Sequence, residues 1–172
     1  MTDEDDTNQP DVPRSADRNR LIEINLDEAS LAARVSVNTR HDREVAIYDL
    51  LDENSFILND RDDGPYKLTL GRLEDRLVFD VADADDEPLV THVLSFSPLR
   101  RIIKDYFMVC DSYYEAIKIA PPSKIQTIDM GRRGLHDEGS LLLTERLHGK
   151  ITVDHSTARR LFTLICSLYS KG

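Results

Sequence analysis

The stretch SPLRRIIKDYFMVCDSYYEAIKIA, residues 97–120, decides the fold. Its large apolar side chains recur every three or four residues, the spacing that places them on one face of an α-helix. They are Leu99, Ile102, Ile103, Tyr106, Phe107, Cys110, Tyr113, Tyr114 and Ile117. Ser97 suits a helix N-cap, Pro98 suits the first helical position, and Pro121 ends the helix. The pattern therefore predicts an amphipathic helix over 98–119 that must cover an apolar surface.

The segments before this helix predict the surface that it covers. Apolar and polar residues alternate there in short runs, which is typical of half-buried β-strands. The runs are residues 20–26, 55–58, 66–70, 77–81 and 88–96. Short polar and acidic stretches separate the last four runs, as in an antiparallel meander. We therefore expect an antiparallel sheet with one apolar face that needs cover.

Three further segments predict helices, at about 40–53, from Ser123 onward and over 156–171. The fold class is therefore α+β: an antiparallel meander sheet of about four to five strands, covered by three to four helices. Residues 1–19 are acidic and almost free of large apolar side chains, so they predict a disordered acidic tail. No linker follows, and we expect a single α+β domain over 20–172.

Composition bounds the location of the protein. No apolar run approaches the roughly 20 residues of a membrane span, and the acidic start does not resemble a signal peptide. The chain has only two cysteines, Cys110 and Cys166, both on apolar helix faces. We expect them to be buried and reduced. These features predict a cytoplasmic protein with no membrane partner.

The net charge of −10 is unevenly distributed along the chain. Residues 1–95 carry 24 Asp and Glu against 10 Lys and Arg, whereas residues 96–172 carry 8 against 12. The phosphate backbone repels a net acidic protein, so a nucleic-acid partner is not expected. The basic C-terminal half either attracts the acidic half within one fold or offers a surface to an acidic protein or small anion.

The stretch MGRRGLHDEGS, residues 130–140, allows two structures. In an unbroken helix, Arg132 lies on the buried side and needs an oppositely charged partner. The three glycines would together cost such a helix about 3 kcal/mol relative to alanine, which close packing or a bend must offset. In a broken helix, the charged residues project from a loop. We favour a helix with a bend between residues 131 and 139.

Three pairs of arginines are the candidate contacts to a partner or ligand. They are Arg132 and Arg133, Arg100 and Arg101, and Arg159 and Arg160. The last two pairs follow serines that we expect to cap helices, so the macrodipole disfavours these cations unless an anion binds. The first hypothesis is therefore a non-enzymatic interaction or regulatory protein. Its basic C-terminal surface would meet an acidic partner or an anionic ligand.

The alternative hypothesis is a small enzyme that acts on a phosphorylated or carboxylated metabolite. His136 would be the general base, Asp137 its orienting carboxylate, and the arginines the substrate anchors. The sequence contains no phosphate-binding glycine motif and no regular metal-ligand spacing. We therefore expect neither a cofactor nor a metal, and the sequence leaves open whether the protein is an enzyme.

Several strings together resemble a family of small bacterial proteins, the uncharacterised protein family 0262. They are RLVFDV, PLVTHVLSFSPLRRIIKDYF, SYYEAIK, IDMGRRGLHDEGS and TARRLFTLIC. The resemblance covers nearly all of residues 20–170. It implies a compact soluble bacterial protein, and it carries no activity, cofactor or catalytic residue onto this chain.

Overall fold

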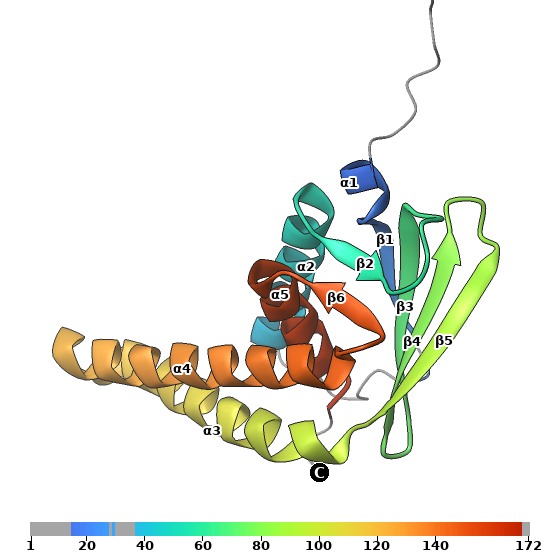
Figure 1. The fold of residues 1–172 in the computed structure, drawn as a ribbon. Coiled ribbons are helices and arrows are strands. Elements are labelled where there is room, and N and C mark those ends of the chain that lie inside the picture. The colour runs from blue at the N-terminus through green and yellow to red at the C-terminus, as the bar shows by residue number, and fades with distance from the viewer. Residues whose placement is uncertain (1–14, 28, 30–36, 170–172) are drawn as a thin grey trace, which may run out of the picture.

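The chain forms an α+β fold in a computed structural model that describes residues 15–27, 29 and 37–169. In chain order the elements are α1 (Ser15–Arg18), β1 (Leu21–Leu26), α2 (Val37–Asp52), β2 (Phe56–Leu58), β3 (Tyr66–Leu73), β4 (Arg76–Asp83), β5 (Pro88–Ser95), α3 (Ser97–Ile119), α4 (Pro122–Leu147), β6 (Ile151–Val153) and α5 (His155–Cys166). Figure 1 shows the described helices on one side of the main sheet, with α3 and α4 extending beyond it as a hairpin. The predicted α+β class is confirmed.

The main sheet has four strands in the order β1-β3-β4-β5. Strands β3, β4 and β5 form the predicted antiparallel meander. The prediction is wrong for β1, which pairs with β3 in parallel. Parallel neighbours need a long crossover connection, and the chain makes it through α2. The sheet is therefore mixed rather than a pure meander.

The predicted strand at 55–58 does not belong to that sheet. Strand β2 pairs antiparallel with β6 in a separate two-stranded sheet. Phe56 lies opposite Val153 and Leu58 opposite Ile151, and all four side chains are buried. Strand β6 was not predicted from the sequence, because its formation depends on pairing with β2, which is far away along the chain.

One face of the main sheet contributes to the core. Leu68, Leu70, Leu77 and Phe79 are fully buried there. Burial of each such side chain stabilises the fold by about 1.5–3 kcal/mol. The helices contribute Leu99, Ile103, Leu143, Leu147, Leu161, Phe162 and Ile165 to the same core. Leu99, Ile102, Ile103 and Tyr106 of α3 are buried, as its amphipathic pattern predicts. The prediction is wrong for Ile117, which is 49% exposed where the α3–α4 hairpin extends beyond the sheet.

Two expected helix caps are wrong. Phe96 is the N-cap residue of α3, and Ser97 instead donates a hydrogen bond to Asp75 Oδ2 over 2.6 Å. Asp154, not Ser156, is the N-cap of α5, where its carboxylate accepts from the backbone N–H of Thr157. Both arginine pairs therefore lie one or two residues deeper in their helices than expected. The macrodipole acts mainly on the first turn of a helix, so it disfavours these arginines less than expected. The reason to expect a bound anion at these helix ends is weaker for the same reason.

Helix α4 runs without interruption through 131–139, and its ribbon is straight in Figure 1, so the expected bend is not there. Close packing accounts for one of the three glycines. A Cβ added at Gly139 would lie 2.3 Å from the Cζ of Phe162, closer than atoms can approach. Gly131 and Gly134 have open space around them. Only Gly139 is required by packing, because it lets α5 approach α4 closely.

Most of the predicted acidic tail, residues 1–14, lies outside the described residues. The described part includes α1, where Arg18 lies 3.5 Å from Asp62. The carbonyl of Asn19 accepts from the backbone N–H of Phe56 over 2.9 Å.

Cys110 and Cys166 are buried and unbridged, as predicted. Among the described helices, none combines the length and apolar character that crossing a bilayer requires.

Replacing Gly139 with alanine tests the contact between α4 and α5. The new methyl group overlaps the fully buried Phe162 ring, so Gly139→Ala should lower the free energy of unfolding by about 1–3 kcal/mol. The matched change Gly134→Ala meets no neighbour and should raise it by up to about 1 kcal/mol. Urea denaturation measures both values. Equal stability of the two variants would contradict the packing role of Gly139.

Candidate functional site

A hollow of about 490 Å³ lies between α2 and α4, with α5 as its floor. Each helix contributes one face. The lining residues are His41, Asp42, Val45, Ala46 and Asp49 from α2, Tyr106 from α3, Arg132, Arg133 and His136 from α4, and Ser156, Arg159, Arg160 and Thr163 from α5. Within each helix these residues are one, three or four positions apart, so they share a face. We call this hollow the arginine pocket.

The α4 arginines share one carboxylate. Arg132 Nη2 lies 2.6 Å from Asp129 Oδ1, and Arg133 Nε lies 3.1 Å from Asp129 Oδ2. The Arg132 guanidinium also lies 4.5 Å from the centre of the Tyr113 ring. Arg132 is half-buried, so the predicted need for a partner in an unbroken helix is confirmed. One carboxylate for two guanidinium groups leaves positive charge on this wall.

The α5 arginines differ from each other in their partners. Arg159 Nε lies 3.3 Å from Asp137 Oδ1, which also lies 3.6 Å from His155 Nε2. Arg160 is half-buried and has no ion pair within the described ranges. A half-buried guanidinium normally has a carboxylate or phosphate partner, because its desolvation is costly. Arg160 is therefore the cation in the arginine pocket that is best placed to receive a ligand.

The opposite wall of the arginine pocket is acidic. Asp42 and Asp49 project from α2. Burial raises the pKa of Asp42, while Arg132 and His41 oppose that shift. The arginine pocket thus has guanidinium groups on the α4 and α5 side and carboxylates on the α2 side. Such a division suits a ligand that carries both an anionic group and hydrogen-bond donors.

His136 is held as a neutral imidazole. Its Nε2 lies 2.8 Å from the Thr163 hydroxyl, which donates to the carbonyl of Arg159 over 3.2 Å. The hydroxyl therefore accepts from His136 Nε2–H, and Nδ1 is left buried without a partner in the described structure. The rings of Tyr106 and Phe162 pack edge-on against the imidazole at 5.4 and 5.1 Å. Burial, together with the charge of Arg159, lowers the pKa of His136 to about 4.

Asp137 does not orient the imidazole of His136. Its carboxylate faces α5, where it contacts Arg159 and His155. No hydrogen bond joins it to His136 among the described contacts. A histidine with a pKa of about 4 is also a weak base at neutral pH. The geometry therefore favours binding over acid–base catalysis at this position.

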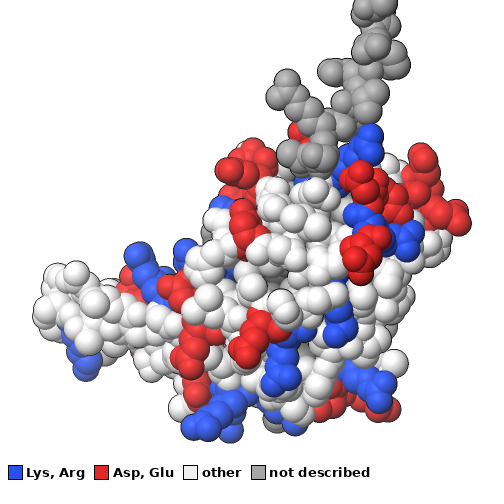
Figure 2. All heavy atoms as spheres, in the orientation of Figure 1, with Lys and Arg blue, Asp and Glu red and all other residues white. Residues whose placement is uncertain are grey.

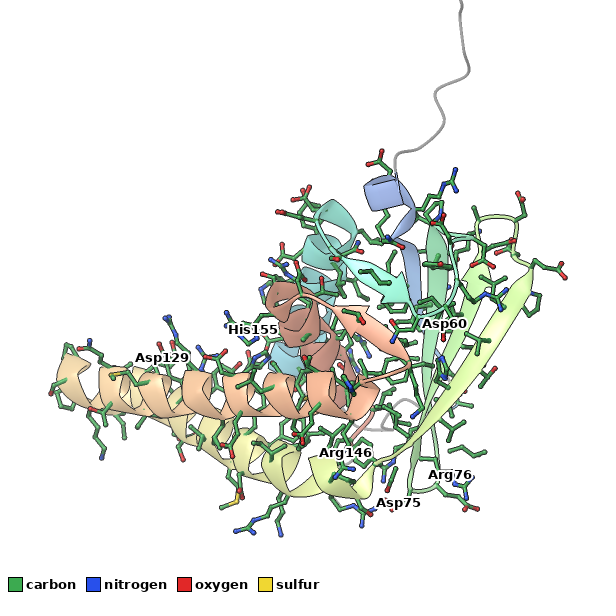
Figure 3. The ribbon with its side chains drawn as sticks, viewed as in Figure 1. Asp60, Asp75, Arg76, Asp129, Arg146 and His155 are labelled. Carbon is green, nitrogen blue, oxygen red and sulfur yellow. The ribbon has the colours of Figure 1, made fainter. Side chains whose placement is uncertain are left out.

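The third arginine pair lies elsewhere. Arg100 forms an ion pair with Asp75 in the turn between β3 and β4, and Arg101 is exposed. Neither residue lines the arginine pocket. In Figure 3, Asp75 lies beside the start of α3, whereas Asp129 lies toward the other end of the α3–α4 hairpin. The structure thus brings four of the six candidate arginines together.

A family model described as "Uncharacterised protein family (UPF0262)" matches residues 18–171. The chain belongs to UPF0262. A UPF0262 protein of Nitrobacter hamburgensis is 53% identical over 160 residues, which cover 93% of this chain and 97% of that relative. Another, of Mesorhizobium japonicum, is 56% identical over 156 residues, or 90% and 96% of the two chains. Their names carry the family designation and no activity. No solved structure matches the chain significantly.

The contribution of α2 to the arginine pocket of this UPF0262 chain was not predicted from the sequence. His41, Asp42, Val45 and Asp49 share one face of that helix, and this spacing could have singled them out. The sequence around α2 does not show that this face lies opposite α4. The two helices are placed by their contacts with α5, which is far from α2 along the chain.

Among the described residues, no group of three or more His, Cys, Asp and Glu side chains could hold a metal ion.

The low pKa of His136 predicts a specific pH dependence of stability. The unfolded chain takes up a proton near pH 6.5, whereas the folded protein does so only near pH 4. Stability should therefore fall as the pH falls through this window, by at most about 1.4 kcal/mol per pH unit from this residue. His136→Gln should remove that part of the slope, measured by urea denaturation from pH 7 to 4. A slope unaffected by His136→Gln would refute the assignment.

Proposed function

We propose that the arginine pocket binds a small organic anion through a phosphate or carboxylate group. The observation that carries this proposal is Arg160, which is half-buried at the pocket and has no ion pair within the described part of the chain. Arg132, Arg133 and Arg159 approach the same hollow from two helices. Several guanidinium groups around one hollow match the planar, multidentate recognition of phosphate and carboxylate.

The shape of the site favours a small ligand over an acidic protein. A hollow of about 490 Å³ lies within the range of small-molecule pockets. Figure 2 shows acidic and basic residues interspersed on the face in view, rather than one broad basic surface. The arginines are concentrated in a concavity instead, where low-dielectric walls strengthen their field.

The chemistry of the arginine pocket supports binding rather than turnover. His136 is neutral, held by Thr163 and packed between aromatic rings. His136 forms a rigid wall beside the arginines. Its pKa of about 4 is too far below neutral pH for an effective general base. We therefore propose a ligand-binding, regulatory role, and a cytoplasmic location where phosphorylated and carboxylated metabolites are available.

Thermal unfolding in the presence of anions tests the proposal. Inorganic phosphate, sugar phosphates and dicarboxylates are the probes. A bound anion at about 100 times its Kd adds roughly 2.7 kcal/mol of stability, a shift of several degrees for a chain of this size. Arg160→Gln should weaken binding at least tenfold, because it removes the unpaired guanidinium and breaks no described ion pair.

Arg101→Gln is the matched control. It removes an exposed arginine that lies outside the arginine pocket, so anion binding should stay at the wild-type level. A flat response of the wild-type protein to every anion would overturn the proposal. An equal loss in both variants would show nonspecific charge attraction instead of a site.

A further inference from the structure

A second hollow of about 450 Å³ adjoins the arginine pocket along α2. It lies between α2 and α3, beside the C-terminal part of α5. Its lining residues are Asn38, Thr39, Asp42, Tyr106, Phe107, Cys110, Asp111, Tyr114, Glu115, Lys118, Thr163, Cys166, Ser167 and Tyr169. Asp42, Tyr106 and Thr163 line both hollows, so these three side chains form the boundary between them. We call the second hollow the aromatic pocket.

The walls of the aromatic pocket suit a flat ring. Four aromatic side chains line it, and Phe107 stacks on Tyr169 with ring centres 5.6 Å apart. Burial raises the pKa of the Cys110 and Cys166 thiols, so the sulfur atoms there are uncharged. Polar groups of Asn38, Thr39 and other lining residues accompany the rings. Aromatic faces with polar groups beside them match a heterocycle better than an alkyl chain.

Asp42 lies at the boundary of the two pockets and is half-buried. Tyr114 and Arg132 both favour its charged form, and burial opposes them by raising its pKa. A carboxylate between an arginine-lined hollow and an aromatic hollow repels a second anionic group. It accepts hydrogen bonds from hydroxyl groups, as acidic residues do from the ribose of bound dinucleotides.

From the arginine pocket across Asp42 to the aromatic pocket, the order of groups is therefore guanidinium, carboxylate and aromatic ring. Building on the proposed function, we infer that the ligand is a nucleoside monophosphate. Its phosphate lies among Arg132, Arg133, Arg159 and Arg160, its sugar hydroxyls donate to Asp42, and its base lies in the aromatic pocket near Phe107. The two hollows together have room for a ligand of this size.

Isothermal titration calorimetry of the full chain with three kinds of probe tests this inference. The probes are the four ribonucleoside 5′-monophosphates, ribose 5-phosphate and inorganic phosphate. At least one nucleotide should bind about tenfold more tightly than ribose 5-phosphate, because a base stacked on aromatic side chains adds affinity. Phe107→Leu keeps an apolar side chain and removes the ring. It should abolish most of that tenfold advantage and leave the affinity for ribose 5-phosphate unchanged.

Tyr48→Leu is the control, since Tyr48 is exposed on α2 and lines neither pocket. Its affinities should equal those of the wild-type protein. Equal binding of nucleotides and ribose 5-phosphate would overturn the nucleotide assignment and leave the anion-binding proposal intact. Binding of none of the probes would overturn the nucleotide assignment and would exclude phosphate as the anionic group of the proposed function.

Discussion

The contact between the Phe162 ring and the backbone of Gly139 is the constraint on which the site depends. No side chain larger than hydrogen fits at position 139, since an added Cβ would lie 2.3 Å from that ring. The close approach of α4 to α5 turns Arg132 and Arg133 toward the hollow that the α5 arginines also line. The same ring packs against His136 and Tyr106. One close helix contact therefore builds both the floor and the rigid wall of the arginine pocket.

The distribution of charge follows from this packing. Asp129 and Asp137 neutralise part of the positive charge on α4 and α5, and Arg160 keeps its guanidinium free of ion pairs within the described residues. Desolvation of His136 keeps its imidazole uncharged, because its pKa falls to about 4. The site thus combines pre-positioned cations with a neutral imidazole. That combination is suited to holding an anion and poorly suited to moving a proton.

Local patterns in the sequence predicted much of the fold and part of the site. The apolar stripe of α3 and the alternation in β3, β4 and β5 were sufficient to predict these elements, because each pattern depends on neighbouring residues alone. The parallel pairing of β1 and the short strand β6 were missed, because long-range packing decides both. The arginine pairs were identified as contact candidates, but the approach of α2 to them was not. The packing role of Gly139 was also missed, because it depends on a contact with Phe162 of α5 that the local sequence does not show.

Arginine side-chain NMR tests the central claim most directly, namely that α4 and α5 bind one anion together. The Nε–Hε signals of Arg132, Arg133, Arg159 and Arg160 can be followed while ribose 5-phosphate is added. We expect them to shift along one saturable curve with a single Kd, while the signals of Arg100 and Arg101 stay in place. Shifts that do not saturate, or different Kd values for the two helices, would contradict a shared site.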